Sequence, residues 1–187
     1  MNTTVKKQNR LPREVWAASI SLKGLWPEQS IEKRIKDVLA RMESVYAFEP
    51  DIICIPETFQ ISWVNESKTL DEIAEDENTP GPVTSRMAEV AKRQNCYFVC
   101  PIVTKKNGKY YNSSILLNRQ GKIDGVYHKI HPTDTEIIPE VYYKGGGMTP
   151  GTLKPPVFKT DFGTIGLQIC MDAAWCGNWQ SLREAGA

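Results

Sequence analysis

The feature that most constrains the fold is an apolar segment, an amphipathic segment and a second apolar segment in succession. Residues 14–22 (EVWAASISL) and 51–57 (DIICIPE) are apolar runs of strand length. Between them, apolar residues of 30–48 recur at the helical period, Ser30 is a typical N-cap, and Pro50 follows the expected helix end. This order predicts a βαβ unit with parallel strands in an α/β fold. The continuous apolar character of 51–57 predicts burial on both faces.

The middle of the chain predicts a second helix and an antiparallel set of strands. Pro80-Gly81-Pro82 opens the helix, and Asn95 ends it. Three segments are predicted as consecutive antiparallel strands, with turns at Asn107-Gly108 and Gln120-Gly121: 96–103, 110–118 and 122–128. Pro101 cannot donate a ladder hydrogen bond, which places it at an edge, an end or a bulge. A loop, a strand pair and a short helix follow: 132–156, 157–161 with 164–170, and 178–186.

Composition indicates a globular protein of ordinary type. The chain has 187 residues, 41% of them apolar and 24% charged, and a net charge of +1. This length predicts one domain, which we place at 14–187, after a polar tail at 1–13. The near-zero net charge argues against nucleic acid as a partner, because phosphate binding needs a basic surface.

Targeting signals and cysteine usage indicate a cytoplasmic protein. No run approaches the roughly 20 apolar residues that span a bilayer, and the polar residues 1–13 are neither a signal peptide nor a membrane anchor. Five cysteines, an odd number, are expected as reduced thiols. Without a secretion signal, the glycosylation-like patterns Asn65-Glu66-Ser67 and Asn112-Ser113-Ser114 carry no weight.

Several other patterns are interpreted as structural. The acidic run 65–77 is expected as a solvated surface segment, with a lid or a site for a cationic substrate as the alternative. His128 and His131 lack companions at zinc spacing, so no metal is expected. Cys96 and Cys100 do not have redox spacing and are expected in the core. The run 145–147 (GGG) lacks the end of a phosphate loop and predicts a flexible loop.

Three reactive side chains stand at the ends of predicted strands: Glu57, Lys129 and Cys170. Strand ends hold a site rigidly while exposing it. A thiol needs a base to become a thiolate and a nearby cation to lower its pKa, and a carboxylate with an ammonium group supplies both. The ammonium group could then stabilise the oxyanion of a tetrahedral intermediate. Taken alone, this spacing indicates only an α/β domain with a possible thiol site.

The local sequences around these residues resemble the nitrilase superfamily of carbon–nitrogen hydrolases. PETF at 56–59, YHKIHPT at 127–133 and GLQICMD at 166–172 occur in that family's order of glutamate, lysine and cysteine. Their flanks and the closing LREAGA also match, so the resemblance covers most of the chain from residue 15 onward. It implies an αββα sandwich, association into a homo-oligomer by stacking of two sandwiches, and no metal or organic cofactor.

The resemblance also implies roles for individual residues. Glu57 would be the general base, Lys129 the oxyanion stabiliser and Cys170 the nucleophile. For the family's second glutamate, Glu136 is favoured because it follows a Pro-Thr pair, and Glu140 remains the alternative. Two further candidates are the backbone N–H of Met171, as an oxyanion donor, and Trp175, as a wall of the substrate pocket.

The implied function is hydrolysis of a non-peptide C–N bond in a small molecule, through a cysteine thioester. A small amide or N-carbamoyl compound is the first choice, because Asp172, two residues after the cysteine, resembles those branches. A nitrilase is the alternative, supported by the Pro132-Thr133…Glu136 pattern. A third hypothesis is a non-catalytic remnant or a fragment that acts with a partner chain.

The third hypothesis comes from the length of the chain. Family members continue beyond the position of Ala187, so the sequence resembles the N-terminal two-thirds of a domain. Each large aliphatic side chain left uncovered would lose on the order of 1.5–3 kcal/mol of burial free energy. We therefore expect these 187 residues alone to aggregate or to be poorly active.

Overall fold

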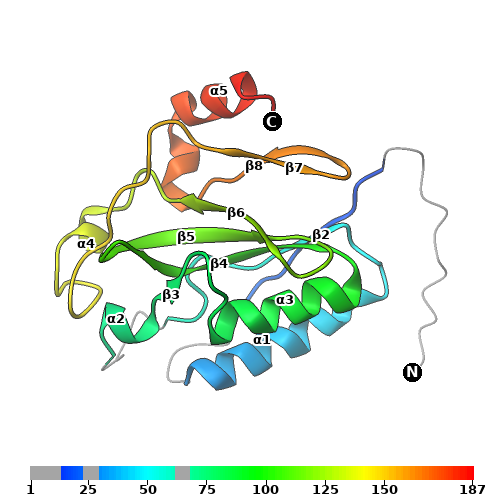
Figure 1. Cartoon of the computed structure of the whole chain (residues 1–187), viewed down its shortest axis with the longest axis horizontal. Helices are drawn as coiled ribbons and strands as arrows, with labels where there is room; N and C mark the ends of the chain where they lie inside the picture. The colour runs from blue at the N-terminus through cyan, green and yellow to red at the C-terminus, as the bar shows by residue number, and fades with distance from the viewer. Residues whose placement is uncertain (1–13, 23–29, 62–67) are drawn as a thin grey trace.

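The computed structural model describes residues 14–22, 30–61 and 68–187, and arranges them in four layers (Figure 1). The strands are β1 (Ala17–Ser19), β2 (Ile52–Cys54), β3 (Glu75–Asp76), β4 (Tyr97–Lys106), β5 (Lys109–Leu117), β6 (Ile123–His128), β7 (Val157–Thr160) and β8 (Gly163–Gly166). The helices are α1 (Ile31–Tyr46), α2 (Leu70–Ile73), α3 (Pro82–Gln94), α4 (Asp134–Ile137) and α5 (Cys176–Glu184), with a 3₁₀ helix at Cys170–Ala174. Within these ranges, no helix combines the length and the apolar character needed to cross a bilayer.

The main sheet has the strand order β1-β2-β4-β5-β6, and β3 also pairs with β4. β1, β2 and β4 run parallel, which confirms the βαβ prediction. β4, β5 and β6 run antiparallel, which confirms the three-strand prediction. At the first turn of this set, Asn107 and Gly108 have φ of 50° and 73°, the left-handed conformation that a tight hairpin needs.

The two long helices begin and end as their capping residues predict. The Ser30 side chain accepts a hydrogen bond from the Lys33 amide at 3.3 Å and caps α1. Asn95 ends α3 in the left-handed conformation, with φ of 51°. At the other end of α3, the Glu75 carboxylate accepts hydrogen bonds from the amides of Val83 (2.6 Å) and Thr84 (3.0 Å).

The acidic run is a surface segment only in part where the structure describes it: Asp71, Glu72 and Asp76 are exposed, as predicted, whereas Glu75 and Glu77 are buried. Residues 65–67 of this run lie outside the described residues. Glu75 is buried against the start of α3. Glu77 is also buried. Its carboxylate accepts a hydrogen bond from His128 Nε2 at 2.8 Å and forms an ion pair with Lys106. Both carboxylates are therefore committed to the fold.

The prediction for 51–57 was wrong in length and in burial. Strand β2 covers only Ile52–Cys54, and Glu57 lies in the turn that follows. Ile53 is fully buried on the helix side, whereas Cys54 on the other side is exposed. Pro56 has no amide hydrogen to donate, which limits how far the strand can pair.

Pro101 occupies the interior of β4 rather than its end, at a stretch where only β5 is a partner. β2 pairs with β4 as far as Val99, and β3 pairs with it from Thr104. Between these two stretches, Pro101 is paired with Ser114 of β5. The missing amide hydrogen is thus tolerated at a local edge of the sheet.

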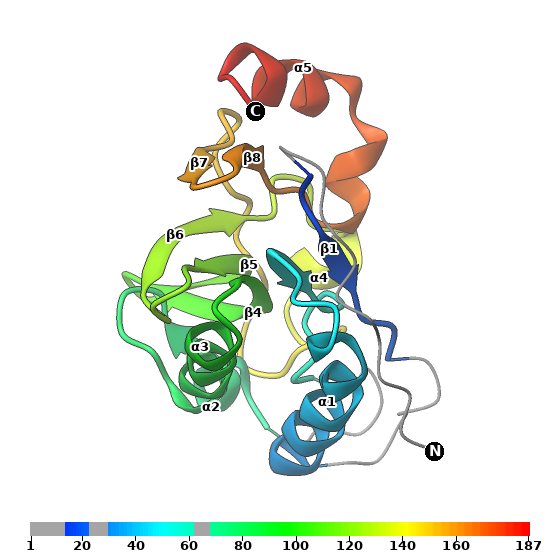
Figure 2. The same ribbon diagram turned by 90° about the vertical axis from the view of Figure 1, so that its right-hand side faces the viewer.

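The alternation of side chains along β4 builds the core on both faces of the main sheet. Phe98, Cys100 and Ile102 are fully buried against α1 and α3. Tyr97 and Val99 face the opposite side and pack in a second cluster with Phe158 and Ile169. Because both faces are covered, β4 reads as a continuous apolar run. Figure 2 shows α1 and α3 on one side of the main sheet and the β7–β8 pair on the other.

The β7–β8 pair and α5 form the third and fourth layers. Close contact depends on two glycines: a β-carbon at Gly125 of β6 would overlap the Phe158 ring, and one at Gly166 would press on Leu182 of α5. The succession of helices, main sheet, small sheet and α5 is the predicted αββα sandwich (Figure 1).

Arg119 joins the two sheets at the end of the sandwich where β5 turns into β6. Its guanidinium donates to Asp161 in the β7–β8 turn at 2.6 and 3.0 Å, and to Asp51 before β2 at 3.0 Å. It also donates to the Asn95 carbonyl and lies over the Tyr97 ring, 5.4 Å from its centroid. One side chain therefore links four segments.

We expect Arg119→Met to lower the free energy of unfolding by about 1–3 kcal/mol, because hydrogen bonds between charged groups are lost and two carboxylates lose their partner. Arg86→Met is the matched control. Its ion pair with Glu89 is long (3.7 Å) and exposed, so it should change stability by less than about 0.5 kcal/mol. Urea denaturation measures both. Equal effects would contradict the linking role of Arg119.

Candidate active site

Lys129 lies at the centre of a buried cluster of charges. It follows the last residue of β6 and is only 2% exposed. Its Nζ donates to Glu57 Oε1 and to Glu136 Oε2, both at 2.8 Å. Burial acts to lower the pKa of Lys129, but the hydrogen bonds and charges of the two carboxylates outweigh it and raise the pKa above its ordinary value. The side chain is therefore an ammonium ion.

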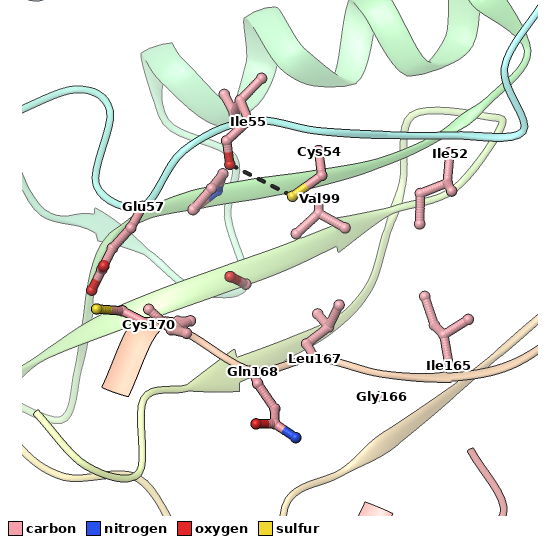
Figure 3. Close-up of a pocket in the computed structure, with 13 residues that line it drawn as sticks. Ile52, Cys54, Ile55, Glu57, Val99, Ile165, Gly166, Leu167, Gln168 and Cys170 are labelled. Atoms are coloured by element: carbon pink, nitrogen blue, oxygen red, sulfur yellow. Dashed lines mark hydrogen bonds between the residues drawn. The ribbon is translucent and has the colours of Figure 1, made fainter. Parts of the chain in front are cut away.

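Glu57 reaches this cluster from the turn after β2. Its Oε1 accepts two hydrogen bonds, from Lys129 and from Asn112 Nδ2 (2.6 Å). Its side chain remains 23% exposed, unlike that of Lys129. In Figure 3 the Glu57 carboxylate points at the Cys170 sulfur across the mouth of a cavity. A carboxylate that faces a thiol and is reachable by substrate can act as a general base.

Glu136, rather than Glu140, is the second carboxylate that the fold brings to Lys129. Glu136 lies in α4, which Thr133 caps, and accepts from the Thr133 amide at 2.7 Å. Burial acts to raise its pKa, but hydrogen bonds from Lys129, Thr133 and Asn112 hold the pKa below the ordinary value. Glu140 is exposed and accepts from the Gly145 amide at 2.7 Å.

The triglycine run lies in a loop, as predicted, and hydrogen bonds on either side of the run tie this loop to neighbouring segments. Lys144 accepts a backbone hydrogen bond from Leu70 at 2.8 Å, and the Met148 amide donates to the Glu136 carbonyl at 2.8 Å. A β-carbon at Gly147 would overlap the Ile137 carbonyl. Glycine therefore permits the close approach that positions α4.

Cys170 begins the 3₁₀ helix with φ of +47°, a conformation that a side chain with a β-carbon rarely adopts. Its thiol is exposed, and the Glu57 carboxylate points at the sulfur (Figure 3). Burial and the Glu57 charge raise the pKa of Cys170 above its ordinary value, although Lys129 and the Met171 amide act to lower it. The cation thus acts on this pKa in the expected direction, but burial and the Glu57 charge outweigh it. Lys129 is itself paired with two carboxylates.

Asp172 connects the segment that carries Cys170 with the segment that carries Lys129. The carboxylate is fully buried and accepts from the Tyr127 hydroxyl (2.6 Å) and the His131 amide (2.8 Å). It also accepts from the Ile169 amide at 3.2 Å. One backbone amide close to Lys129 in the chain, that of His131, and one next to Cys170, that of Ile169, thus donate to the same carboxylate. Sequence reasoning used Asp172 only as a marker of a family branch.

Neither Trp175 nor Met171 lines the cavity beside the thiol, so the prediction of Trp175 as a pocket wall was wrong. Trp175 is 54% exposed and stacks on His131, with ring centroids 4.6 Å apart. The Met171 side chain is also exposed, while its amide faces the Cys170 thiol.

His131 itself is next to Asp172, at 3.1 Å. His128, the other histidine of the pair, contacts Glu77 and Tyr111 instead. Over the described ranges, no cluster of metal-ligating side chains occurs.

The cavity beside the thiol has a volume of about 420 Å³ and lies between the two sheets (Figure 3). Glu57 and Cys170 stand at one end of it. Its walls are mainly apolar and come from both sheets: Ile52, Cys54, Ile55, Val99, Pro101, Ser114, Ile165, Gly166, Leu167, Gln168 and Ile169. A volume of this size suits a small molecule.

Asn112 is the residue of the cluster that sequence reasoning missed. The register of β5 against β6 pairs Ser113 with His128, and the Lys129 amide donates to the Asn112 carbonyl at 2.8 Å. A polar residue in a buried strand directly opposite the lysine was the available signal.

Comparison with known proteins points to one family. A family model described as carbon-nitrogen hydrolase matches residues 17–187. The nitrilase and fragile histidine triad fusion protein NitFhit of Drosophila melanogaster is 33% identical over 127 residues, which cover 67% of this chain and 27% of that protein. The deaminated glutathione amidase of Synechocystis is 33% identical over 88 residues, 46% of this chain and 32% of that protein.

The fold comparison agrees. The carbon-nitrogen hydrolase from Helicobacter pylori matches with a TM-score of 0.73 at 20% identity, covering 92% of this chain and 57% of that protein. This likeness supports the fold alone. The chain thus spans less than two thirds of the length of each of these proteins.

We expect Glu57→Gln to lower the pKa of the Cys170 thiol, because it removes the negative charge beside the sulfur and leaves Lys129 with less compensation. The rate of Cys170 alkylation by iodoacetamide, followed against pH by mass mapping, reports this pKa. Glu140→Gln is the matched control and should leave the profile unchanged. An unchanged or upward-shifted profile in Glu57→Gln would contradict the geometry.

We expect Asp172→Asn to lower the free energy of unfolding by more than about 2 kcal/mol, because buried donors lose a charged acceptor. Tyr127→Phe removes only one of those donors and leaves the charge, so it should cost about 1 kcal/mol. Chemical denaturation compares the two variants. A loss in Asp172→Asn no larger than that in Tyr127→Phe would show that Asp172 is not the connecting group.

Proposed function

Because the chain belongs to the carbon–nitrogen hydrolase family, we propose that it hydrolyses a non-peptide C–N bond of a small amide or N-carbamoyl compound. Glu57 is the general base, Cys170 the nucleophile and Lys129 the stabiliser of the oxyanion. The observation that carries this proposal is the position of Glu57, whose carboxylate accepts from Lys129 at 2.8 Å and points at the Cys170 sulfur (Figure 3). A base beside both a nucleophile and a fixed cation is what this chemistry needs.

The first half of the proposed reaction forms a thioester. Glu57 takes the thiol proton as the Cys170 sulfur bonds to the carbonyl carbon, and the carbonyl oxygen becomes an oxyanion. The Lys129 ammonium and the Met171 amide stabilise that oxyanion. The C–N bond then breaks, the carbonyl re-forms, and the proton on Glu57 moves to the leaving nitrogen, which departs as ammonia or an amine.

The second half of the reaction returns the enzyme to its starting state. Glu57 takes a proton from water, and the resulting hydroxide attacks the thioester carbon. The C–S bond breaks, the product leaves as a carboxylic acid, and the proton on Glu57 returns to the thiolate. An N-carbamoyl substrate would release a carbamic acid that decomposes to carbon dioxide and ammonia. A thiol that is protonated at rest suits this scheme, since one carboxylate serves both halves.

An amide or carbamoyl substrate is preferred over a nitrile on two observations. Asp172 follows the cysteine by two residues, and the Synechocystis relative is named an amidase. The nitrile remains the second candidate, because Glu136 follows Thr133 as in some nitrilases and binds the same ammonium group as Glu57. An amide and the corresponding nitrile would both be attacked by Cys170 and would end in the same carboxylic acid.

The proposal is tested by ammonia release from a panel of small amides, N-carbamoyl amino acids and nitriles. Cys170→Ala is expected to remove all activity, and Lys129→Met to lower kcat by on the order of 10²–10³-fold. Cys176→Ser, a change in another exposed thiol, is the matched control and should retain full activity. Mass spectrometry of the quenched reaction should show the acyl group on Cys170.

Each outcome of that panel decides between the hypotheses. Hydrolysis of amides or N-carbamoyl compounds with acylation of Cys170 supports the proposal, whereas hydrolysis of nitriles alone favours the second candidate. Activity that survives in Cys170→Ala would overturn the assignment of the nucleophile. No hydrolysis of any substrate by the purified chain would favour the hypothesis of a non-catalytic or partner-dependent chain.

A further inference from the structure

The amide side chain of Asn112 binds both carboxylates of the site at once. Its Nδ2 donates to Glu57 Oε1 at 2.6 Å and to Glu136 Oε1 at 2.8 Å. The residue is buried in the middle of the molecule, with 1% exposure. An amide nitrogen carries two hydrogens, so each carboxylate receives one of them and the donor capacity of Nδ2 is used completely.

The orientation of this amide is determined by its neighbours. If the amide were rotated by 180°, its oxygen would face two carboxylate oxygens, which have no hydrogen to donate. In the observed orientation, Asn112 Oδ1 finds no hydrogen-bond donor within the described part of the chain. A buried acceptor without a partner is unfavourable. Two hydrogen bonds to carboxylates, which are stronger than hydrogen bonds between neutral groups, offset this contribution.

Asn112 and Lys129 together hold the two glutamates in a closed ring. Glu136 receives Asn112 at Oε1 and Lys129 at Oε2. Glu57 receives both at the same oxygen, Oε1. The other oxygen of Glu57 accepts from neither, and the carboxylate faces the Cys170 thiol (Figure 3).

The charges of the cluster explain why a neutral donor is useful at this position. Two neighbouring carboxylates repel each other, and one of them tends to take up a proton. Lys129 supplies a single positive charge for both. Asn112 adds two hydrogen bonds to the ionised forms without adding charge, whereas a second cation would weaken Glu57 as a base.

We propose that Asn112 is a positioning residue of this site, which holds Glu57 and Glu136 around Lys129 and directs the free oxygen of Glu57 at Cys170. Its consequence for catalysis rests on the proposed function. Its effect on the two carboxylates does not, and this makes a test without substrate possible.

The catalytic test compares Asn112→Leu with Ser113→Ala. Ser113 is the next residue of β5, is equally buried and hydrogen-bonds to Thr104 at 2.6 Å, away from the carboxylates. Asn112→Leu is expected to lower kcat on the order of 10²-fold, as for a misplaced catalytic group, with little change in KM. The acidic limb of its pH profile should move to higher pH, because the pair of carboxylates around Lys129 loses two hydrogen bonds that favour its ionised form. Ser113→Ala should leave the limb in place.

The test without substrate measures the free energy of unfolding at several pH values. The lowered pKa of Glu136 stabilises the folded protein above the ordinary glutamate range, and this stabilisation is lost as the pH falls through the lowered pKa. Without Asn112 the pKa is lowered less. The destabilisation by Asn112→Leu should therefore be larger at pH 7 than at pH 4, whereas that by Ser113→Ala should not depend on pH.

The titratable groups that face the two carboxylates are Lys129, the Cys170 thiol and the buried Tyr143 hydroxyl. Lys129 and Tyr143 do not change charge between pH 4 and pH 7, since both have pKa values raised above their ordinary ones. Cys170 also stays protonated over this range. The difference between pH 7 and pH 4 that is specific to Asn112→Leu thus reports Glu136, whose pKa the Asn112 hydrogen bond helps to lower.

Asn112→Ala removes the same donors without requiring space for a larger apolar group, and should change both measurements in the same direction. If both variants behave like Ser113→Ala, with an unmoved acidic limb and a destabilisation that does not depend on pH, the proposal is overturned. If the unmodified chain hydrolyses nothing, the proposed function fails, but the unfolding measurements still decide the role of Asn112.

Discussion

The ammonium group of Lys129, buried between two carboxylates, is the interaction on which the rest of the site depends. An unpaired charge at this depth would cost several kcal/mol, so Glu57 and Glu136 must both reach Nζ. These partners come from the turn after β2 and from α4, far apart in the chain. The sheet brings β2 and β6 to a common end, and the loop from Thr133 to Met148 folds back to deliver α4.

A second buried carboxylate, Asp172, places the thiol relative to that ammonium group. It accepts from the Ile169 amide just before Cys170 and from the His131 amide beyond Lys129, so the two reactive segments share one anchor. Arg119 acts similarly at the opposite end of the sandwich, where it joins the β7–β8 turn to the main sheet. Charged groups at both ends thus fix the position of the small sheet relative to the main sheet, in addition to the apolar packing between them.

The electrostatic state of Cys170 follows from this arrangement. Lys129 is already compensated by two carboxylates, and the nearest charge to the sulfur is negative, so the thiol keeps its proton at rest. A protonated thiol is a weak nucleophile by itself. In the proposed mechanism, its reactivity depends on transfer of that proton to Glu57, so that deprotonation of the thiol and its attack on the substrate occur in one step.

Local patterns in the sequence determined the elements of this protein and the residues at their ends. Periodicity and capping placed α1, α3 and the β4–β5–β6 set, because these elements depend on residues that are neighbours in the chain. The family resemblance selected Glu57, Lys129 and Cys170 as candidate catalytic residues. Only the tertiary structure decided that Glu136 rather than Glu140 meets the lysine, that Asn112 and Asp172 hold the site, and that the thiol pKa rises. Those outcomes depend on strand register, on burial and on the sum of all nearby charges, which arise between segments distant in the chain.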